Sequence, residues 1–272
     1  MTPKELVGRV GLYVLISLIT LFMALPVLWL LFAPFDSSPT LSTSLPEWTG
    51  RNFAELLRNP DALPSIGISL VHALGTMALV TGFGALAAYA LSRVRIPGRD
   101  GLLYALLLLS SIITGTAAMV PIFTLMTQIG LVDTQLGVVL VLTGGMLPTA
   151  IFILKDFMDG IPRSYEESAR VFGAGPLQIL RDVVLPVVRP GLATIAVWTV
   201  VQVWGNFLTP FILLRQAERP AAVVVYTFYT EGGQADLGLI SAFSLLYSIP
   251  VVAMYLLVNR RYGFRFHGGI KR

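Results

Sequence analysis

The chain has 272 residues and a formal net charge of +4; 55% of its residues are hydrophobic and only 12% are charged. Soluble domains carry about 25% charged residues, so this composition excludes an ordinary soluble domain and indicates an integral membrane protein in a lipid bilayer. Cysteine is absent, which excludes disulfides and thiolate metal sites, and His72 and His267 are far apart in sequence. We therefore expect no bound metal and no nucleic-acid partner.

The chain contains six apolar segments that are long enough to cross a bilayer, which takes about 20 apolar residues. We therefore predict an all-α integral membrane protein with six transmembrane helices. A signal peptide has an apolar core of only about 7–15 residues, so the longer first segment is also predicted to be a span. The predicted spans cover residues 10–32, 65–91, 102–126, 136–157, 187–214 and 239–259.

The remaining sequence shows no internal repeat and no low-complexity segment, so we predict one transmembrane domain over residues 1–272. Residues 34–63 are rich in proline and polar residues and are predicted to form a loop with a short surface helix. In the second span, the glycine and alanine run at 82–90 predicts close approach by another helix.

The distribution of lysine and arginine predicts the orientation. The N-terminus, residues 93–99, residues 155–189 and the C-terminal tail together hold 15 of the 19 basic residues, and the other loops hold 4. Basic residues accumulate on the cytoplasmic side, so both termini and residues 155–189 are predicted to be cytoplasmic. This pattern requires an even number of spans.

A polar segment at residues 163–185 interrupts the apolar sequence between the fourth and fifth predicted spans. Ser164 followed by Glu167 has the spacing of a capping box and predicts a helix start. Gly173 predicts the helix end, because glycine is the usual residue just after a helix C-cap. Glu166 and Arg170 are spaced i, i+4, in the order that favours an ion pair.

The same helix would carry small and aromatic residues on one face, namely Tyr165, Ala169, Phe172 and Gly173. Two interpretations follow from the spacing. The helix could dock into a cleft of a partner outside the membrane, or it could lie on the membrane surface and cover the ends of the spans.

Several polar residues fall within the predicted spans, where lipid offers no hydrogen-bonding partner. One interpretation is a hydrophilic path for a solute; the other is hydrogen bonding between helices or to backbone carbonyls. Gln202 and Asn206 are spaced i, i+4 and are predicted to share one face of the fifth span. The predicted path residues are Ser111, Thr114, Gln202 and Asn206.

The sequence Glu167-Ser168-Ala169, followed by Gly173 and Leu185-Pro186, resembles the EAA motif of the permeases of binding-protein-dependent ABC importers. In that family the motif forms a coupling helix that docks in a groove of the ATPase subunit. Four positions depart from the family pattern: Ser168 replaces alanine, Phe172 replaces aspartate, Ile68 stands before Ser69 where asparagine is typical, and Gly205 is inserted before Asn206. Further similarities occur at residues 88–93, 97–98, 121–123, 129–134, 157–162, 204–210 and 268–271.

The resemblance is to permeases of the carbohydrate-uptake class, of the MalG-like type. It implies the type I ABC importer permease fold, with a coupling helix between spans four and five. It also implies that this chain is a non-catalytic subunit that forms half of the path for a sugar or sugar-like solute. The coupling residues that it implies are Ser164, Glu166, Glu167, Ser168, Ala169, Arg170, Phe172, Gly173, Ala174, Leu185 and Pro186.

The partners implied by the resemblance are a second permease subunit in a probable heterodimer, a cytoplasmic ATPase dimer and an extracytoplasmic solute-binding protein. ATP and magnesium would bind to the ATPase, since this chain lacks the Gly-x-x-x-x-Gly-Lys-Ser/Thr phosphate-binding loop. The implied location is the bacterial cytoplasmic (inner) membrane.

Two alternative functions stay open at this point. A membrane-embedded enzyme acting on lipid-linked sugars could use the acids Asp156, Asp159, Glu166 and Glu167, although charged helix ends explain them more simply. A secondary transporter would need no ATPase, but no predicted span carries the pair of acids that a proton relay would need.

Overall fold

The computed structural model describes residues 3–40, 47–94, 97–113, 116–230 and 235–262. Over these residues the chain is helical, and its one extended pairing is an isolated bridge between Asp36 and Trp48. The predicted all-α class is therefore confirmed.

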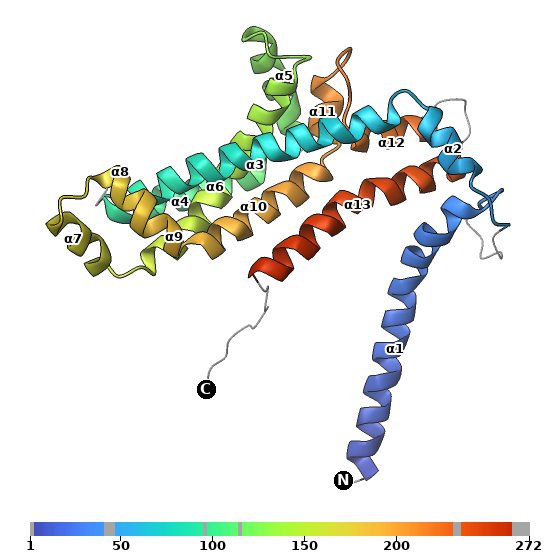
Figure 1. Ribbon diagram of the computed structural model, residues 1–272, viewed down its shortest axis with the longest axis horizontal. Coiled ribbons are helices and arrows are strands. Elements are labelled where there is room, and N and C mark those ends of the chain that lie inside the picture. Colours follow the sequence, from blue (N-terminus) through green and yellow to red (C-terminus); the bar gives the residue numbers. More distant parts are fainter. Residues whose placement is uncertain (1–2, 41–46, 95–96, 114–115, 231–234, 263–272) are drawn as a thin grey trace. The chain divides into compact units, whose positions relative to one another are not determined.

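The helices follow one another along the chain with short connections (Figure 1). They are α1 (Pro3–Phe32), η1 (Ala33–Phe35), α2 (Arg51–Arg58), α3 (Ala62–Arg93), α4 (Arg99–Ile113), η2 (Thr116–Ala118), α5 (Met119–Gln128), α6 (Gln135–Asp159), α7 (Ser164–Val171), α8 (Pro176–Ile179), η3 (Leu180–Val184, a π-helix), α9 (Leu185–Val187), α10 (Arg189–Trp204), α11 (Leu208–Leu213), α12 (Ala221–Thr230) and α13 (Leu237–Tyr262).

Four described helical segments are individually long and apolar enough to cross a membrane: Gly8–Phe35, Ala62–Arg93, Gln135–Asp159 and Leu237–Leu257. They correspond to the first, second, fourth and sixth predicted spans. A fifth candidate consists of Pro176–Val187 and Arg189–Trp204, which meet at a bend of 78°.

The third and fifth predicted spans are broken rather than continuous. Residues 102–126 are divided among α4, η2 and α5, and α5 has Pro121 in its first turn, where the missing proline N–H is tolerated. Residues 187–214 are interrupted after Trp204. There the Asn206 side chain accepts a hydrogen bond from the Thr209 N–H at 3.1 Å, which replaces a helical backbone bond and lets α11 begin anew.

The described contacts divide the chain into two compact units. Unit 1 comprises Met1–Leu63 with Val224–Ile249, and unit 2 comprises Pro64–Val223 with Pro250–Arg272. The single domain over residues 1–272 stays a prediction.

In unit 1, the buried side-chain amide of Asn52 holds the segment that follows α1. The side-chain amide of Asn52, on α2, donates hydrogen bonds to the carbonyls of Pro34 and Asp36 at 3.0 and 2.8 Å. The side-chain oxygen of Asn52 lies so close to Gly238 that a Cβ there would approach it to 2.6 Å. Glycine is therefore required at the start of α13.

Unit 2 contains the main apolar core, built where α3, α6 and α10 pack together (Figure 1). The small residues predicted on the second span fulfil their expected role. Ala85 and Ala88 are buried, and a Cβ at Gly84 would be in contact with Leu154 and Ala150 of α6. The buried core residues are Val80, Ala85, Ala88, Ala150, Leu154, Met158, Ile161, Ile179, Leu180, Val184, Val188 and Ile195.

We predict that Gly191→Ala destabilises the contact between α6 and α10. A Cβ at position 191 would lie 2.7–3.1 Å from the ring of Phe157, closer than real Cβ atoms approach. Overpacking of this kind costs about 1–3 kcal/mol. The loss should appear as a lower unfolding temperature of the purified protein in detergent.

Gly144→Ala is the matched control, because it is also a glycine in a helix and a Cβ there meets nothing within 4 Å. Equal unfolding temperatures for the two variants would contradict the predicted clash.

Candidate functional site

The predicted cytoplasmic helix exists as α7, but it begins differently from the capping-box prediction. The N-cap is Arg163, which makes no side-chain capping bond, and its carbonyl accepts the N–H groups of Glu166 and Glu167, each at 3.0 Å. Ser164 is already inside the first turn because Arg163 has helical backbone angles, so the capping box is wrong. The acids of the first turn still favour the helix, since they lie at the positive end of its dipole.

The end of α7 is the glycine stop that the sequence predicts. Gly173 has a φ of +85°, its N–H bonds to the Arg170 carbonyl at 2.9 Å, and the Ala174 N–H bonds to the Ala169 carbonyl at 3.1 Å. This pair of bonds is the Schellman motif, in which glycine adopts the left-handed conformation at low cost. The prediction is confirmed.

The predicted small-and-aromatic face of α7 is divided between the interior and the surface. Ala169 and Ala174 pack against the core of unit 2, whereas Phe172 is 91% exposed and Val171 is 85% exposed. The expectation that Ala169 lies on the same outward surface as Phe172 is therefore wrong. What α7 presents outward is an apolar tip formed by Val171 and Phe172, which we call the α7 tip.

The segment after α7 fixes it to the core. Ile179, Leu180 and Val184 are buried, and Leu185, at the start of α9, packs against the same cluster. The EAA-like segment is thus one face of the core rather than a free loop. In Figure 1, α7 and α8 lie at one end of α3, α6 and α10.

Glu166 is the least exposed residue of α7, at 2%. Its Oε1 accepts from Arg93 Nε at 2.5 Å, and its Oε2 accepts from the Tyr89 hydroxyl at 3.1 Å. The predicted ion pair with Arg170 is present at 3.7 Å, but Arg93, which sequence reasoning missed, is the nearer partner. The sequence gives no signal for this pair, because Arg93 and Glu166 are 73 positions apart.

Asp159, another acid at the end of α6, is also paired. Asp159 accepts from Ser92 Oγ at 2.5 Å and from Lys155 Nζ at 2.6 Å, and Lys155 lies 3.9 Å from Asp100. An acid–base or metal site would need carboxylates that converge on a substrate. Among the described residues, no three His, Cys, Asp or Glu side chains are grouped to hold a metal ion.

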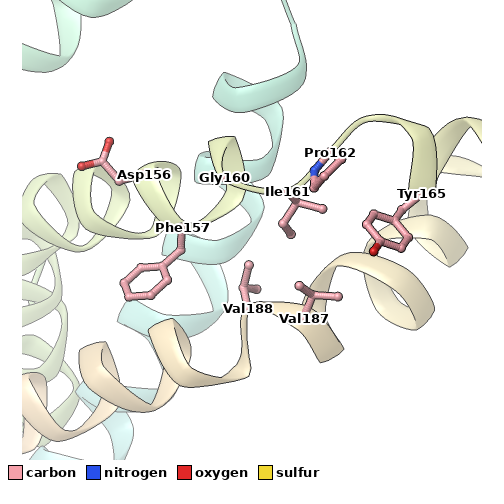
Figure 2. A pocket seen from close by; sticks show the side chains of 8 residues that line it. All are labelled: Asp156, Phe157, Gly160, Ile161, Pro162, Tyr165, Val187 and Val188. Atoms are coloured by element: carbon pink, nitrogen blue, oxygen red, sulfur yellow. The ribbon is translucent and has the colours of Figure 1, made fainter. Parts of the chain in front are cut away.

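A cleft of about 500 Å³ opens beside α7, between the end of α6 and the bend that precedes α10. In Figure 2 the side chains of Ile161 and Val188 point toward one another, and the carboxylate of Asp156 points away from them. The residues lining the cleft are Asp156, Phe157, Gly160, Ile161, Pro162, Tyr165, Val187 and Val188.

The predicted path residues are not brought together by the described structure. Gln202 is exposed on α10, and Asn206 lies beyond its end, in the break before α11, so the two do not share one helix. The side chain of Ser111 and the whole of Thr114 lie outside the described residues. The predicted path therefore stays a prediction.

At the opposite end of unit 2, Asp133 joins two loops. Its carboxylate Oδ1 accepts the backbone N–H groups of Arg215, Gln216 and Ala217 at 2.8, 2.9 and 2.9 Å. Its own N–H donates to the Leu213 carbonyl at 2.8 Å, and its backbone has a φ of 62°. These backbone hydrogen bonds lower the pKa of Asp133, because they stabilise the charged form.

Two neighbours of Asp133 extend this connection. Thr134 is the N-cap of α6 and accepts the Gly137 N–H at 3.0 Å. The amide of Gln135 donates to the Glu218 carbonyl at 2.8 Å, and its oxygen is 2.6 Å from His72 Nε2. We call the Asp133 and Gln135 contacts with residues 213–218 the outer latch. The sequence indicates residues 129–134 only through their similarity to the family and does not predict these contacts.

The model of the binding-protein-dependent transport system inner membrane component matches residues 6–264. The chain belongs to this family. It is therefore a multi-pass permease of the inner membrane and a non-catalytic subunit, and the enzymatic and secondary-transport alternatives are set aside.

The permease is similar to several curated relatives over nearly its full length. It is 30% identical to the inner membrane ABC transporter permease protein YcjP of Escherichia coli K12, covering 95% of each chain. It is 28% identical to the maltodextrin transport system permease protein MdxG of Bacillus subtilis, covering 96% of this chain and 95% of the relative. It is 30% identical to the trehalose transport system permease protein SugB of Mycobacterium tuberculosis, covering 91% and 92%.

Solved structures show that the permease has the type I ABC importer fold. A chain of a bacterial ABC transporter that imports the acidic polysaccharide alginate superposes with a TM-score of 0.84 at 22% identity, over 96% of this chain and 99% of that one. A chain of an alginate transporter in complex with its periplasmic protein superposes with a TM-score of 0.67 at 15% identity.

We predict that the outer latch of the permease weakens in acid. Because the folded-state pKa of Asp133 is lowered, its stabilising contribution is present above the unfolded pKa of about 3.8 and is lost as the pH falls through the lower folded value. The unfolding temperature of wild type should exceed that of Asp133→Asn by a constant margin between pH 5 and 8. That margin should shrink below pH 4.

The matched control is Asp182→Asn, which changes an exposed carboxylate of η3 that is 3.8 Å from Arg181. A margin for Asp133→Asn no larger than that of the control would contradict the latch.

Proposed function

We propose that this permease forms half of the membrane path for a sugar or sugar-like solute. The support is the identity of its relatives: permeases named for maltodextrin and trehalose are 28% and 30% identical to it over more than nine-tenths of the chain. A second permease subunit completes the path, as a probable heterodimer. An extracytoplasmic binding protein delivers the solute.

We further propose that α7 is the coupling helix that docks on a cytoplasmic ATPase dimer, which binds the ATP and magnesium. The observation that carries this proposal is the α7 tip, in which Val171 and Phe172 are exposed while Glu166 is buried and Ala169 packs against the core. A membrane-surface helix would bury such apolar residues in lipid. The positive-inside count predicts that this segment, with its basic residues, lies on the cytoplasmic side, where an ATPase can reach the α7 tip.

Only some of the residues that the EAA resemblance suggests belong to the proposed docking surface. Ser164, Glu167, Ser168 and Phe172 are exposed and available to the ATPase. Glu166, which is buried, and Ala169 and Leu185, which are partly buried against the core, instead hold the helix in place. Gly173 gives the chain its turn away from the docked helix, and Pro186 lies in the segment leading to α10.

The proposed function is tested by purifying the permease complex from native membrane and identifying the co-purifying subunits. An ATPase, a second permease and a solute-binding protein should be present. The complex reconstituted in liposomes should take up a maltodextrin or trehalose only with ATP inside. Uptake without any ATPase would overturn the proposal.

We predict that Phe172→Ala weakens binding of the ATPase by about ten- to a hundredfold, because exposed aromatic residues are frequent hot spots of interfaces. Phe172 has little contact with its own chain, so its removal should leave the unfolding temperature unchanged. Affinity is measured by titrating the ATPase against the permease complex in nanodiscs.

Trp48→Ala is the control for this prediction, since Trp48 is also an exposed aromatic but belongs to the extracytoplasmic loop predicted at 34–63. If Phe172→Ala binds the ATPase as tightly as this control does, the α7 tip is not the docking surface.

A further inference from the structure

We infer that Glu166 is a positioning residue, whose buried ion pair with Arg93 fastens α7 to the cytoplasmic end of α3 so that the two move together. The inference rests on the proposed docking of α7 to the ATPase. It assigns Glu166 to the inside of the permease and leaves its neighbour Glu167 for the partner.

The geometry of Glu166 favours an internal role. Arg93 occupies Oε1 at 2.5 Å, and the Tyr89 hydroxyl donates to Oε2 at 3.1 Å, so both oxygens are bonded to α3. The exposed fractions of the paired side chains are 11% for Arg93 and 2% for Glu166. Little of the carboxylate is left for a partner protein to reach.

The guanidinium of Arg93 joins three helices. Besides Glu166 on α7, it donates from Nη2 to the Met158 carbonyl at 3.1 Å, on α6, and from Nη1 to Ser92 Oγ at 2.9 Å, on α3. Ser92 in turn donates to Asp159 of α6 at 2.5 Å. A displacement of α7 is therefore transmitted to α3 and α6 at one point.

The other contacts of α7 would not hold the helix in one orientation when it is pulled. They include Ala169 of α7 and Ala174 just beyond its end, which are small apolar residues that pack against the core. Apolar contact is non-directional, so it would let the helix slide or turn. A buried ion pair is directional, and separating it leaves an uncompensated charge in a dry environment. The pair therefore resists separation while α7 is pulled.

The test uses the absence of cysteine from the chain. Single cysteines are introduced one at a time over residues 62–72, at the predicted outer end of α3. Their labelling rates are measured in the assembled transporter, with and without ATP and vanadate. The position with the largest nucleotide-dependent change reports whether ATPase closure moves α3, and it needs no knowledge of the solute.

A double-mutant cycle is then run at that position with Arg93→Gln, Glu166→Gln and the two together. Each single variant should reduce the nucleotide-dependent change at least about fivefold, the size of a typical allosteric coupling. The double variant should be no worse than the more affected single variant, because both remove one interaction. Affinity for the ATPase should stay within about threefold of wild type, less than 1 kcal/mol.

Two further variants keep the inference falsifiable. Tyr89→Phe removes only the hydroxyl bonded to Oε2, and its labelling change should lie between wild type and Glu166→Gln. Glu55→Gln is the matched control, because it removes an exposed i, i+4 pair with Arg51 in α2 and should behave as wild type. Should Glu166→Gln fail to insert, Tyr89→Phe and Arg93→Gln decide the question alone.

Three outcomes would overturn the inference. Additive losses would show that Arg93 and Glu166 act separately. Loss of ATPase binding by Glu166→Gln but not by Arg93→Gln would place Glu166 in the docking surface. A lower unfolding temperature with an unchanged labelling response would show a stabilising role only. If no α3 position responds to nucleotide, α3 does not move with α7 and the inference also fails. If the wild-type permease binds no ATPase, the proposed function fails instead.

Discussion

A buried carboxylate needs a cationic partner, and in this permease Glu166 of α7 finds it in Arg93 at the end of α3. That need determines where α7 lies, because the guanidinium is itself held by the Met158 carbonyl of α6. The polar helix is therefore attached where α3 and α6 end together. The arrangement ties the position of α7 to the ends of the two helices behind it.

An apolar layer completes the attachment. Ile179 and Val184 enter the core of unit 2, and the chain then turns by 78° into α10. The short helices after α7 direct their apolar side chains into the core and do not cover Val171 and Phe172. These two side chains therefore stay exposed. An apolar tip on a rigid base is what docking to a second protein requires, since little order is lost when the partner binds.

The two ends of unit 2 are held by different kinds of polar contact. At the end near α7, Glu166, Arg93 and Lys155 are largely buried and each is paired with an opposite charge. At the other end, the carboxylate of Asp133 is held by three consecutive backbone N–H groups and no cation is needed. The first arrangement resists separation of helices, whereas the second fixes the course of the loop at residues 213–218. Both are suited to a protein whose spans must move as units.

The sequence by itself determined the all-α membrane class, the glycine stop at Gly173 and the family, because these depend on composition, local spacing and short motifs. It also predicts the orientation from the basic residues. Only the tertiary structure decided the helix breaks, the inward position of Ala169 and the partner of Glu166. Local periodicity places residues on a face but does not say which face is buried. The Arg93–Glu166 pair depends on two helices that meet only when the chain has folded, so no spacing in the sequence encodes it.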